Sequence, residues 1–298
     1  MRLFIASVLA VLLVFSCPFV TSEVLKTFDK CSEFFFRGQS PVIPGILNPR
    51  SENDRYKKIC QKYTSKEKDS ENVGSGYMFA TLYDTTNRIP VFSAYKYTGR
   101  GNFRRPSSSW MVEPQLDPPV DEMTVPYANQ AINEDFFNNY RLNRGHLFPS
   151  GHAADELTAE STFTLTNIVP QKISFNAGSW NRMEREISDI MNKHCYDNNN
   201  KVLAHVLTGA IPGNNKLNEK VNIPSYMWTA FCCYNSADRS WVSQAYWALN
   251  KEERTDEEKT ISKKSLKELQ EFLSQKWVNN VQLFESNCAK KKPKKPYN

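Results

Sequence analysis

The stretch from Leu142 to Glu186 constrains this chain most, because it combines a predicted polar loop with a histidine, a short β-branched run and a helix-forming segment. It opens with Asn-Arg-Gly-His at 143–146 and continues through Asn-Ile-Val-Pro-Gln at 167–171. Its last part predicts a helix with three side chains at intervals of four residues, Asn176, Trp180 and Glu184. Such spacing places them on one face of an α-helix. A histidine, an asparagine and a glutamate brought together could hold a hard divalent cation beside a general base, an arrangement suited to phosphodiester hydrolysis.

These motifs resemble those of the DNA/RNA non-specific endonucleases in the ββα-metal (His-Me finger) superfamily, which includes the Serratia-type nucleases and endonuclease G. That group has an Asp-Arg-Gly-His tetrad, an Asn-x-x-Pro-Gln turn and a helix carrying Asn, Trp and Glu, in this order. Within it the chain most resembles the secreted endonuclease domain-containing 1 type. The resemblance implies an α+β, ββα-metal nuclease fold with a central antiparallel sheet and flanking helices.

The resemblance also implies a role for each motif residue. His146 is expected to be the general base, since an imidazole with a pKa of about 6.5 accepts a proton at neutral pH. Asn176 is expected to bind Mg²⁺, with Mn²⁺ as the alternative ion and water completing the coordination. Glu184 would bind the metal-bound waters, and Asn143 and Arg144 would complete the catalytic group.

Several polar residues also have a structural interpretation. Arg144 could brace its loop through backbone carbonyls, and Asn167 is expected to orient the strand–helix junction or the histidine. Trp180 is expected to pack the helix rather than touch substrate. His152 has no matching partner in the sequence and is expected on the surface or in a loop. His205 lies in an apolar run and is expected to be a satisfied core histidine.

Three positions depart from the resembled pattern. Asn143 stands where that group mostly has Asp, and an amide keeps the shape of the carboxylate but loses its negative charge. Ser188 and Phe163 stand where some members carry an arginine and an asparagine. These departures favour a second hypothesis, in which a weakly active or inactive nuclease fold serves as a nucleic-acid-binding or interaction module.

A basic loop at 98–126 precedes the central stretch. Either Arg104 or Arg105 is expected to contact the scissile phosphate, and a merely solvated surface is the equally weighted alternative. The formal charge of +6 is compatible with a polyanionic partner but is also common among secreted proteins. The expected partners are DNA and RNA.

Residues 1–22 predict a cleaved signal peptide, with Arg2, the apolar run 3–19 and a small residue at Ser22. No later stretch approaches the ~20 apolar residues that span a bilayer. A secreted, extracellular protein is therefore expected.

The chain has seven cysteines, and six remain when Cys17 leaves with the leader. They suggest up to three disulfides among about 15 possible connectivities. We expect a Cys31–Cys60 bridge, whereas the remaining connectivity stays open. Cys232 and Cys233 are adjacent in a predicted strand, so they should point to opposite faces and bond elsewhere.

The predicted organisation has four parts: a leader at 1–22, a disulfide-tethered extension of loop and short helix at 23–72, an endonuclease domain at 73–288, and a basic disordered tail at 289–298. Hydrophobic patterning predicts strands at 75–84, 89–97, 201–208, 224–233 and 240–249. It predicts helices at 128–140 and 262–277.

Overall fold

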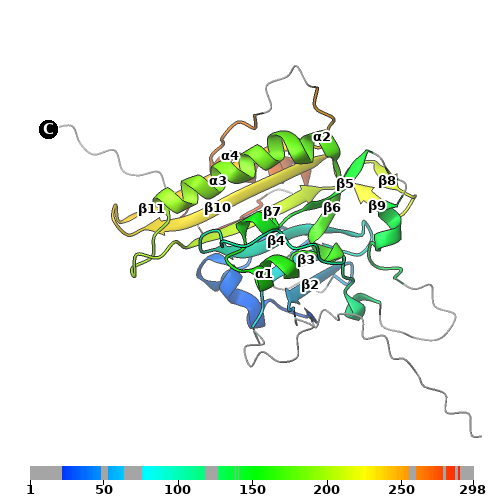
Figure 1. Ribbon diagram of the computed structural model, residues 1–298, viewed down its shortest axis with the longest axis horizontal. Coiled ribbons are helices and arrows are strands. Elements are labelled where there is room, and N and C mark those ends of the chain that lie inside the picture. The colour runs from blue at the N-terminus through cyan, green and yellow to red at the C-terminus, as the bar shows by residue number, and fades with distance from the viewer. Residues whose placement is uncertain are drawn as a thin grey trace, which may run out of the picture.

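Figure 1 shows the computed structural model of the chain, which describes residues 22–47, 53–63, 76–117, 127–137, 139, 141–254, 260–277, 280–285 and 288. The expected leader, apart from Ser22, and the expected tail at 289–298 lie outside these ranges. Across the described ranges, every helix is too short or too polar to cross a membrane.

A seven-stranded sheet forms the centre of the molecule, and each neighbouring pair of strands is antiparallel. From edge to edge the strands are β1 (Glu23–Leu25), β2 (Tyr56–Gln61), β3 (Phe79–Asp84), β4 (Ile89–Tyr97), β7 (Ala204–Ile211), β10 (Tyr226–Asn235) and β11 (Ser240–Leu249). The β3–β4 hairpin and the last three strands confirm the predicted strands. The antiparallel sheet with its few helices matches the predicted α+β class.

Strand β7 runs three residues past the predicted end at Thr208. The extension occurs because β10 pairs along it, with Trp228 opposite Gly209. A Cβ on Gly209 would lie 2.4 Å from both the Trp228 ring and the Val91 carbonyl oxygen. Glycine therefore allows a close approach inside the sheet here, rather than ending the strand.

The N-terminal segment contributes more regular structure than the sequence indicated. The predicted extension of loop and short helix supplies β1 and β2 to the sheet and two 3₁₀ helices, Asp29–Phe34 and Phe36–Gly38. Lys57 and Lys58 obscure the alternation of β2 in the sequence. The domain boundary at 72/73 stays a prediction.

The central strands separate two hydrophobic layers. Val206 and Phe231 belong to the layer beneath α3 (Asn181–His194), which Figure 1 shows lying along the sheet near β10. Their neighbours Leu207 and Cys232 belong to the opposite layer, which the N-terminal segment and α4 (Leu266–Lys276) cover. Helix α4 confirms the predicted helix at 262–277.

The other elements are short. The predicted helix at 128–140 is reduced, among its described residues, to a 3₁₀ helix at Asn133–Phe136, which the chain leaves in an extended conformation at Phe137. The remaining strands are β5 (Leu142–His146), β6 (Ile168–Lys172), β8 (Asn215–Leu217) and β9 (Val221–Ile223). The remaining helices are α1 (Glu156–Ser161), α2 (Ile173–Phe175), a π-helical turn at Asn176–Trp180, and 3₁₀ helices at Pro114–Leu116, Ser150–His152 and Leu165–Asn167.

Three disulfides join distant segments. Cys31 bonds to Cys60, as predicted, and the other two bridges are Cys195–Cys233 and Cys232–Cys288. The adjacent cysteines on β10 thus bond on opposite faces of the sheet, which confirms the expectation from strand geometry.

Candidate active site

The candidate site is built on a small ββα unit. Strands β5 and β6 pair antiparallel, with Asn143 opposite Gln171 and His146 opposite Ile168, and α2, the π-helical turn and α3 follow directly. The segment predicted as a polar loop is therefore a strand. A Cβ on Gly145 would lie 2.1 Å from Gln171 Oε1, so glycine at this position of the motif permits the pairing.

Asn167 fixes the chain where it leaves β5. Its buried side chain accepts hydrogen bonds from the Phe148 N–H (3.0 Å) and the Ser93 hydroxyl (2.8 Å). It donates to the carbonyls of Phe148 and Thr162, each at 3.0 Å. The side chain thus holds the loop after His146, which is one of the two roles expected for it.

His146 lies in an aromatic corner at the end of β5. Its ring centroid is 5.2 Å from that of Trp110 and 5.1 Å from that of Phe163. The residue is only 9% exposed, and Nε2 has no hydrogen-bond partner among the described residues. Burial, aided by the positive charge of Arg105, lowers the pKa of His146 to about 3. The imidazole is therefore neutral at neutral pH and able to accept a proton.

A π-helical turn changes which helix residues face the site. Gly178 has non-helical backbone angles (φ −95°, ψ −113°) inside this turn. Asn176 and Glu184 line the pocket, whereas Trp180 is 1% exposed and packs 5.6 Å from Phe175. The predicted shared face is thus wrong for Trp180, because the π turn shifts the helical phase. Its packing role is as expected.

Glu184 is a half-buried carboxyl group in the pocket. Burial raises the pKa of Glu184 to about 8, although Trp180 and Arg105 act in the opposite direction. The indole N–H of Trp180 lies outside hydrogen-bond geometry, so we regard its effect as minor. Among the described residues this carboxyl group has no hydrogen-bonded cationic partner.

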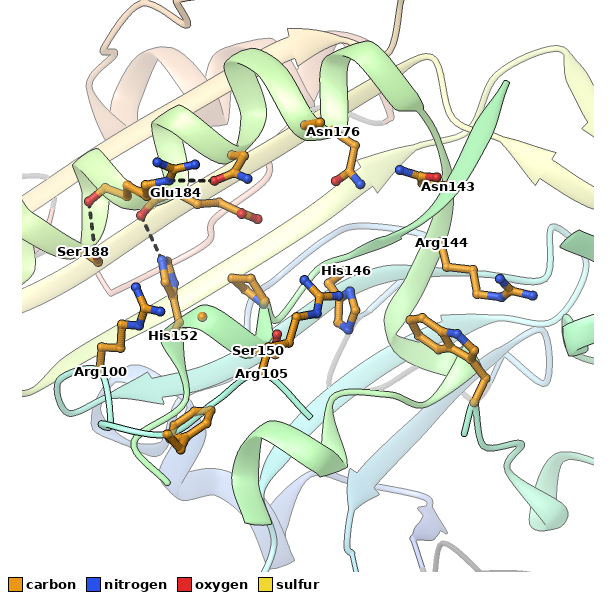
Figure 2. A pocket seen from close by; sticks show the side chains of 17 residues that line it. Arg100, Arg105, Asn143, Arg144, His146, Ser150, His152, Asn176, Glu184 and Ser188 are labelled. Atoms are coloured by element: carbon orange, nitrogen blue, oxygen red, sulfur yellow. Dashed lines mark hydrogen bonds between the residues drawn. The ribbon is translucent and has the colours of Figure 1, made fainter. Parts of the chain in front are cut away.

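A cavity of about 700 Å³ joins these side chains (Figure 2). Its wall carries the Glu184 carboxyl group and four arginines, Arg100, Arg105, Arg144 and Arg185. A pocket with this excess of positive charge suits a phosphate-bearing ligand.

The structure separates the two arginines that the sequence left as alternatives. Arg105 lines the pocket, close enough to lower the pKa of His146, and its guanidinium lies 5.5 Å from the Phe163 ring centroid. Arg104 is exposed and is not part of the pocket wall. Arg105 is thus the phosphate-contact candidate of the two.

Arg144 reaches the edge of the pocket but makes structural contacts. Its guanidinium donates to the main-chain and side-chain oxygens of Asn133 at 3.0 and 2.6 Å. It also lies 5.0 Å from the Phe136 ring centroid. These contacts agree with the bracing interpretation, and a direct part in catalysis stays a prediction.

His152 is buried rather than superficial, so its predicted surface location is wrong. It is 5% exposed and lies 2.9 Å from both the Tyr95 hydroxyl and the Glu184 main-chain oxygen. Its partners come from β4 and α3, far away in the sequence, which is why no local pattern revealed them. His205, by contrast, packs edge-on against Phe36 in a partly buried position, at the margin of the core rather than inside it as expected.

Comparison with known proteins agrees with this geometry. The family model for DNA/RNA non-specific endonucleases matches residues 58–281. This chain belongs to that family. It is 29% identical over 275 residues to the human endonuclease domain-containing 1 protein and 30% identical over 280 residues to its Mus musculus counterpart. Each alignment covers 88% of this chain and 48% of the relative, so the chain spans about half the length of these curated relatives.

A solved structure supports the fold assignment. A chain from the crystal structure of the EndoG/EndoGI complex superposes with a TM-score of 0.51 and 16% sequence identity, covering 66% of this chain and 80% of that one. The predicted α+β, ββα-metal fold of the non-specific endonuclease family is thereby confirmed.

The oxygen-bearing side chains at this family's site suit a hard divalent cation. Asn176 and Glu184 line one pocket, and Figure 2 shows the side chains of Asn143 and Asn176 directed toward one another. No group of three or more His, Cys, Asp or Glu residues in the described parts of the chain forms a metal site. A cation held by few protein oxygens and several waters fits this donor set, and such coordination is typical of Mg²⁺.

The sequence motifs missed some of the pocket wall. Arg100 and Arg185 both line it, although neither belongs to the family motifs. The basic character of the 98–126 loop was the sequence signal for Arg100. For Arg185 the only sequence signal was its position next to Glu184 in the motif helix. Ser188 also lines the pocket, where some family members carry an arginine.

Proposed function

We propose that this chain is a secreted endonuclease that hydrolyses DNA and RNA phosphodiester bonds with the aid of a divalent cation, Mg²⁺ or Mn²⁺. One observation carries the proposal: a neutral His146 faces the same cationic pocket as Asn176 and Glu184. A proton acceptor, metal-binding oxygens and phosphate-binding arginines are the parts that phosphodiester hydrolysis requires.

In the proposed reaction, His146 accepts a proton from a water molecule. The water oxygen forms a bond to phosphorus while the bond from phosphorus to the departing sugar oxygen breaks, and that oxygen then takes a proton from solvent. Arg105 binds the phosphate and keeps it next to His146. A divalent cation, when bound, neutralises charge that develops on the phosphate and on the departing oxygen.

The helix residues have separate proposed tasks. Asn176 would hold the cation through its amide oxygen, and Glu184 would orient water bound to it. Glu184 would release its proton when a cation arrives, since a nearby positive charge favours the carboxylate. Asn143 would hold water beside them through its amide.

Secretion is supported by two features. Residues 1–22 have the composition of a cleaved leader, and three disulfides are typical of proteins that mature in an oxidising compartment. Expression in cultured cells, followed by N-terminal sequencing of protein from the medium, tests this proposal. Retention of the whole chain inside the cells would contradict it.

A plasmid-nicking assay tests the catalytic proposal. We expect purified protein to nick supercoiled DNA and degrade single-stranded RNA in Mg²⁺ or Mn²⁺, and to do neither in chelator. The matched control is the His146→Ala protein from the same preparation.

A second candidate function is nucleic-acid binding without catalysis. Asn143 in place of the family's Asp and Ser188 in place of an arginine favour it. Retarded DNA migration with no cleavage in either metal would select this candidate, and cleavage that chelator abolishes would reject it.

A further inference from the structure

His152 connects two parts of the candidate site that are distant in the sequence. It ends the 3₁₀ helix Ser150–His152, six residues after His146, and its ring nitrogens Nδ1 and Nε2 lie 2.9 Å from Tyr95 Oη and from the Glu184 main-chain oxygen. Figure 2 shows the contact between His152 Nε2 and the Glu184 main-chain oxygen, which connects the His152 segment to α3.

The two partners determine which nitrogen carries the proton. A carbonyl oxygen only accepts, so Nε2 donates to Glu184, and Nδ1 of the neutral ring accepts from the Tyr95 hydroxyl. Burial lowers the pKa of His152 to about 4, which agrees with a neutral ring. With both nitrogens engaged, His152 has no free position for a proton of the reaction.

Tyr95, which contacts His152 Nδ1, is held firmly in the core. Tyr95 is 1% exposed, and its ring stacks on Phe148 with 4.0 Å between the centroids. Asn167 binds both the N–H and the carbonyl of Phe148. The segment from His146 to His152 is therefore fixed to the central sheet at two points.

Helix α3 continues directly from the π-helical turn, in which Gly178 has non-helical backbone angles three residues before α3 begins. Glu184 lies in the first turn after this irregularity. A lateral bond to its main chain therefore ties this turn to the segment that carries His146.

We propose that His152 is a positioning residue: its bond to the Glu184 main chain sets the place of α3, and so of Glu184 and Asn176, relative to His146. This inference rests on the proposed function, in which those two helix residues serve the divalent cation. The nearby His146 would be unaffected in its own contacts, because its aromatic neighbours do not involve His152.

Two substitutions separate the bonds of His152. His152→Gln keeps an N–H near the Nε2 position and so keeps the bond to Glu184. His152→Asn reaches only as far as Nδ1, so it loses that bond and keeps an acceptor for Tyr95. His205→Asn is the matched control, because it removes another histidine with a lowered pKa that lies outside the pocket.

The main measurement is the Mn²⁺ affinity of the full chain without nucleic acid, determined by titration calorimetry. The Mg²⁺ concentration for half-maximal nicking is measured beside it, and the Tm of each variant shows whether it folds. We expect His152→Asn to weaken Mn²⁺ binding and raise the Mg²⁺ requirement about tenfold, as loss of a partner behind a metal ligand does. His152→Gln should stay within about threefold of the parent, and His205→Asn should match it.

Equal Mn²⁺ affinity in the Asn variant and the parent would overturn the proposal, and so would equal losses in the Asn and Gln variants. If the Asn variant does not fold, His152→Ser tests the same bond, because its side chain is too short to reach the Glu184 main-chain oxygen. Unchanged Mn²⁺ affinity in that variant would then overturn it.

The proposed function can fail separately. A parent protein that binds Mn²⁺ but cleaves nothing would reject the enzymatic proposal, and the comparison of variants would still decide the role of His152. A parent that binds neither cation would overturn both.

Discussion

His146 and Glu184 face the same pocket, yet burial shifts their pKa values in opposite directions, to about 3 and about 8. Desolvation disfavours the charged form of each group, so both are neutral at neutral pH without a cation. For the histidine this state is the reactive one, whereas the glutamic acid becomes a useful ligand only after it releases its proton. Burial thus keeps His146 unprotonated, at the cost of lower basicity, and makes the carboxylate form of Glu184 dependent on a cation.

The first prediction concerns the base. His146→Ala should lower metal-dependent cleavage by about 10²–10⁴-fold, the usual contribution of a general base. DNA affinity in chelator should remain, because Arg105 supplies the phosphate contact. Plasmid nicking and a gel-shift titration measure the two quantities, with His205→Ala as the control. Equal turnover by parent and variant would remove His146 from the mechanism.

The second prediction concerns the amide at the start of the motif. Asn143→Asp should maintain or raise the cleavage rate, most visibly at low Mg²⁺, because a carboxylate holds metal-bound water and favours the imidazolium that forms on His146. Asn and Asp are nearly isosteric, so little repacking is expected. Mg²⁺ titrations of both proteins test this, and lower activity of the Asp variant at every concentration would contradict it.

At the scale of the element, the π-helical turn Asn176–Trp180 decides which side chains reach the pocket. It turns Trp180 into the core while Asn176 and Glu184 stay at the pocket wall. A second irregular element, the loop after β4, brings Arg105 beside His146. Both elements bring together groups that regular helices and strands alone would keep apart.

The helix supports a comparison of two substitutions. Asn176→Ala should raise the Mg²⁺ requirement for nicking more than Glu184→Ala does, since the first residue is proposed to hold the cation and the second only its waters. Loss of the latter kind of partner typically costs about 10–100-fold. Mg²⁺ titrations of the two variants rank them. A far larger effect of Glu184→Ala would indicate that Glu184 binds the cation directly and that Asn176 binds its waters.

The loop supports a matched pair of arginine variants. Arg105→Ala should reduce the slope of log affinity against log salt concentration by about one, because it removes one phosphate contact. Arg104→Ala, outside the pocket, should leave the slope closer to that of the parent. Fluorescence anisotropy with a labelled duplex in chelator measures both slopes. Equal slopes for the two variants would show that pocket location does not predict phosphate contact.

At the scale of the whole molecule, one sheet, two hydrophobic layers and three disulfides hold the site. This scaffold also buries a carboxyl group that belongs to none of the motifs. Glu113 is fully buried, accepts a hydrogen bond from the Gln115 N–H, and leaves Oε2 without a partner among the described residues. Burial raises the pKa of Glu113 to about 7.

Glu113 therefore links stability to pH. Its raised pKa means that its contribution is complete below the unfolded value of 4.5 and is lost as pH rises through about 7. Glu113→Gln should remove a pH-dependent loss of about 3 kcal/mol between pH 4.5 and 8. Histidines with lowered pKa values oppose this trend, so the difference between variant and parent is the relevant quantity.

Urea unfolding at pH 5 and pH 8 measures that difference. Glu271→Gln, on the exposed face of α4, serves as the control. A variant whose advantage over the parent is the same at both pH values would exclude Glu113 as the source.

Local patterns predicted much of the molecule. Hydrophobic patterning predicted the β3–β4 hairpin and strands β7, β10 and β11, and strand geometry predicted that Cys232 and Cys233 bond on opposite faces. The resemblance of the motifs to those of the endonuclease family implied that His146, Asn176 and Glu184 share a site, and the structure places all three in one pocket. The strands and the directions of the cysteines are set within a few residues of the sequence, where side-chain periodicity carries the information.

The sequence by itself determined strands β3, β4, β7, β10 and β11, one disulfide and the motif side chains of the pocket. The tertiary structure decided that β7 passes through Gly209, that Arg105 rather than Arg104 reaches His146, and that His152 is buried between β4 and α3. It also set the pKa values of His146 and Glu184. These features depend on which distant segments pack together in the folded chain, because that packing sets the burial of each group and its hydrogen-bond partners. A local sequence pattern carries no information about such contacts.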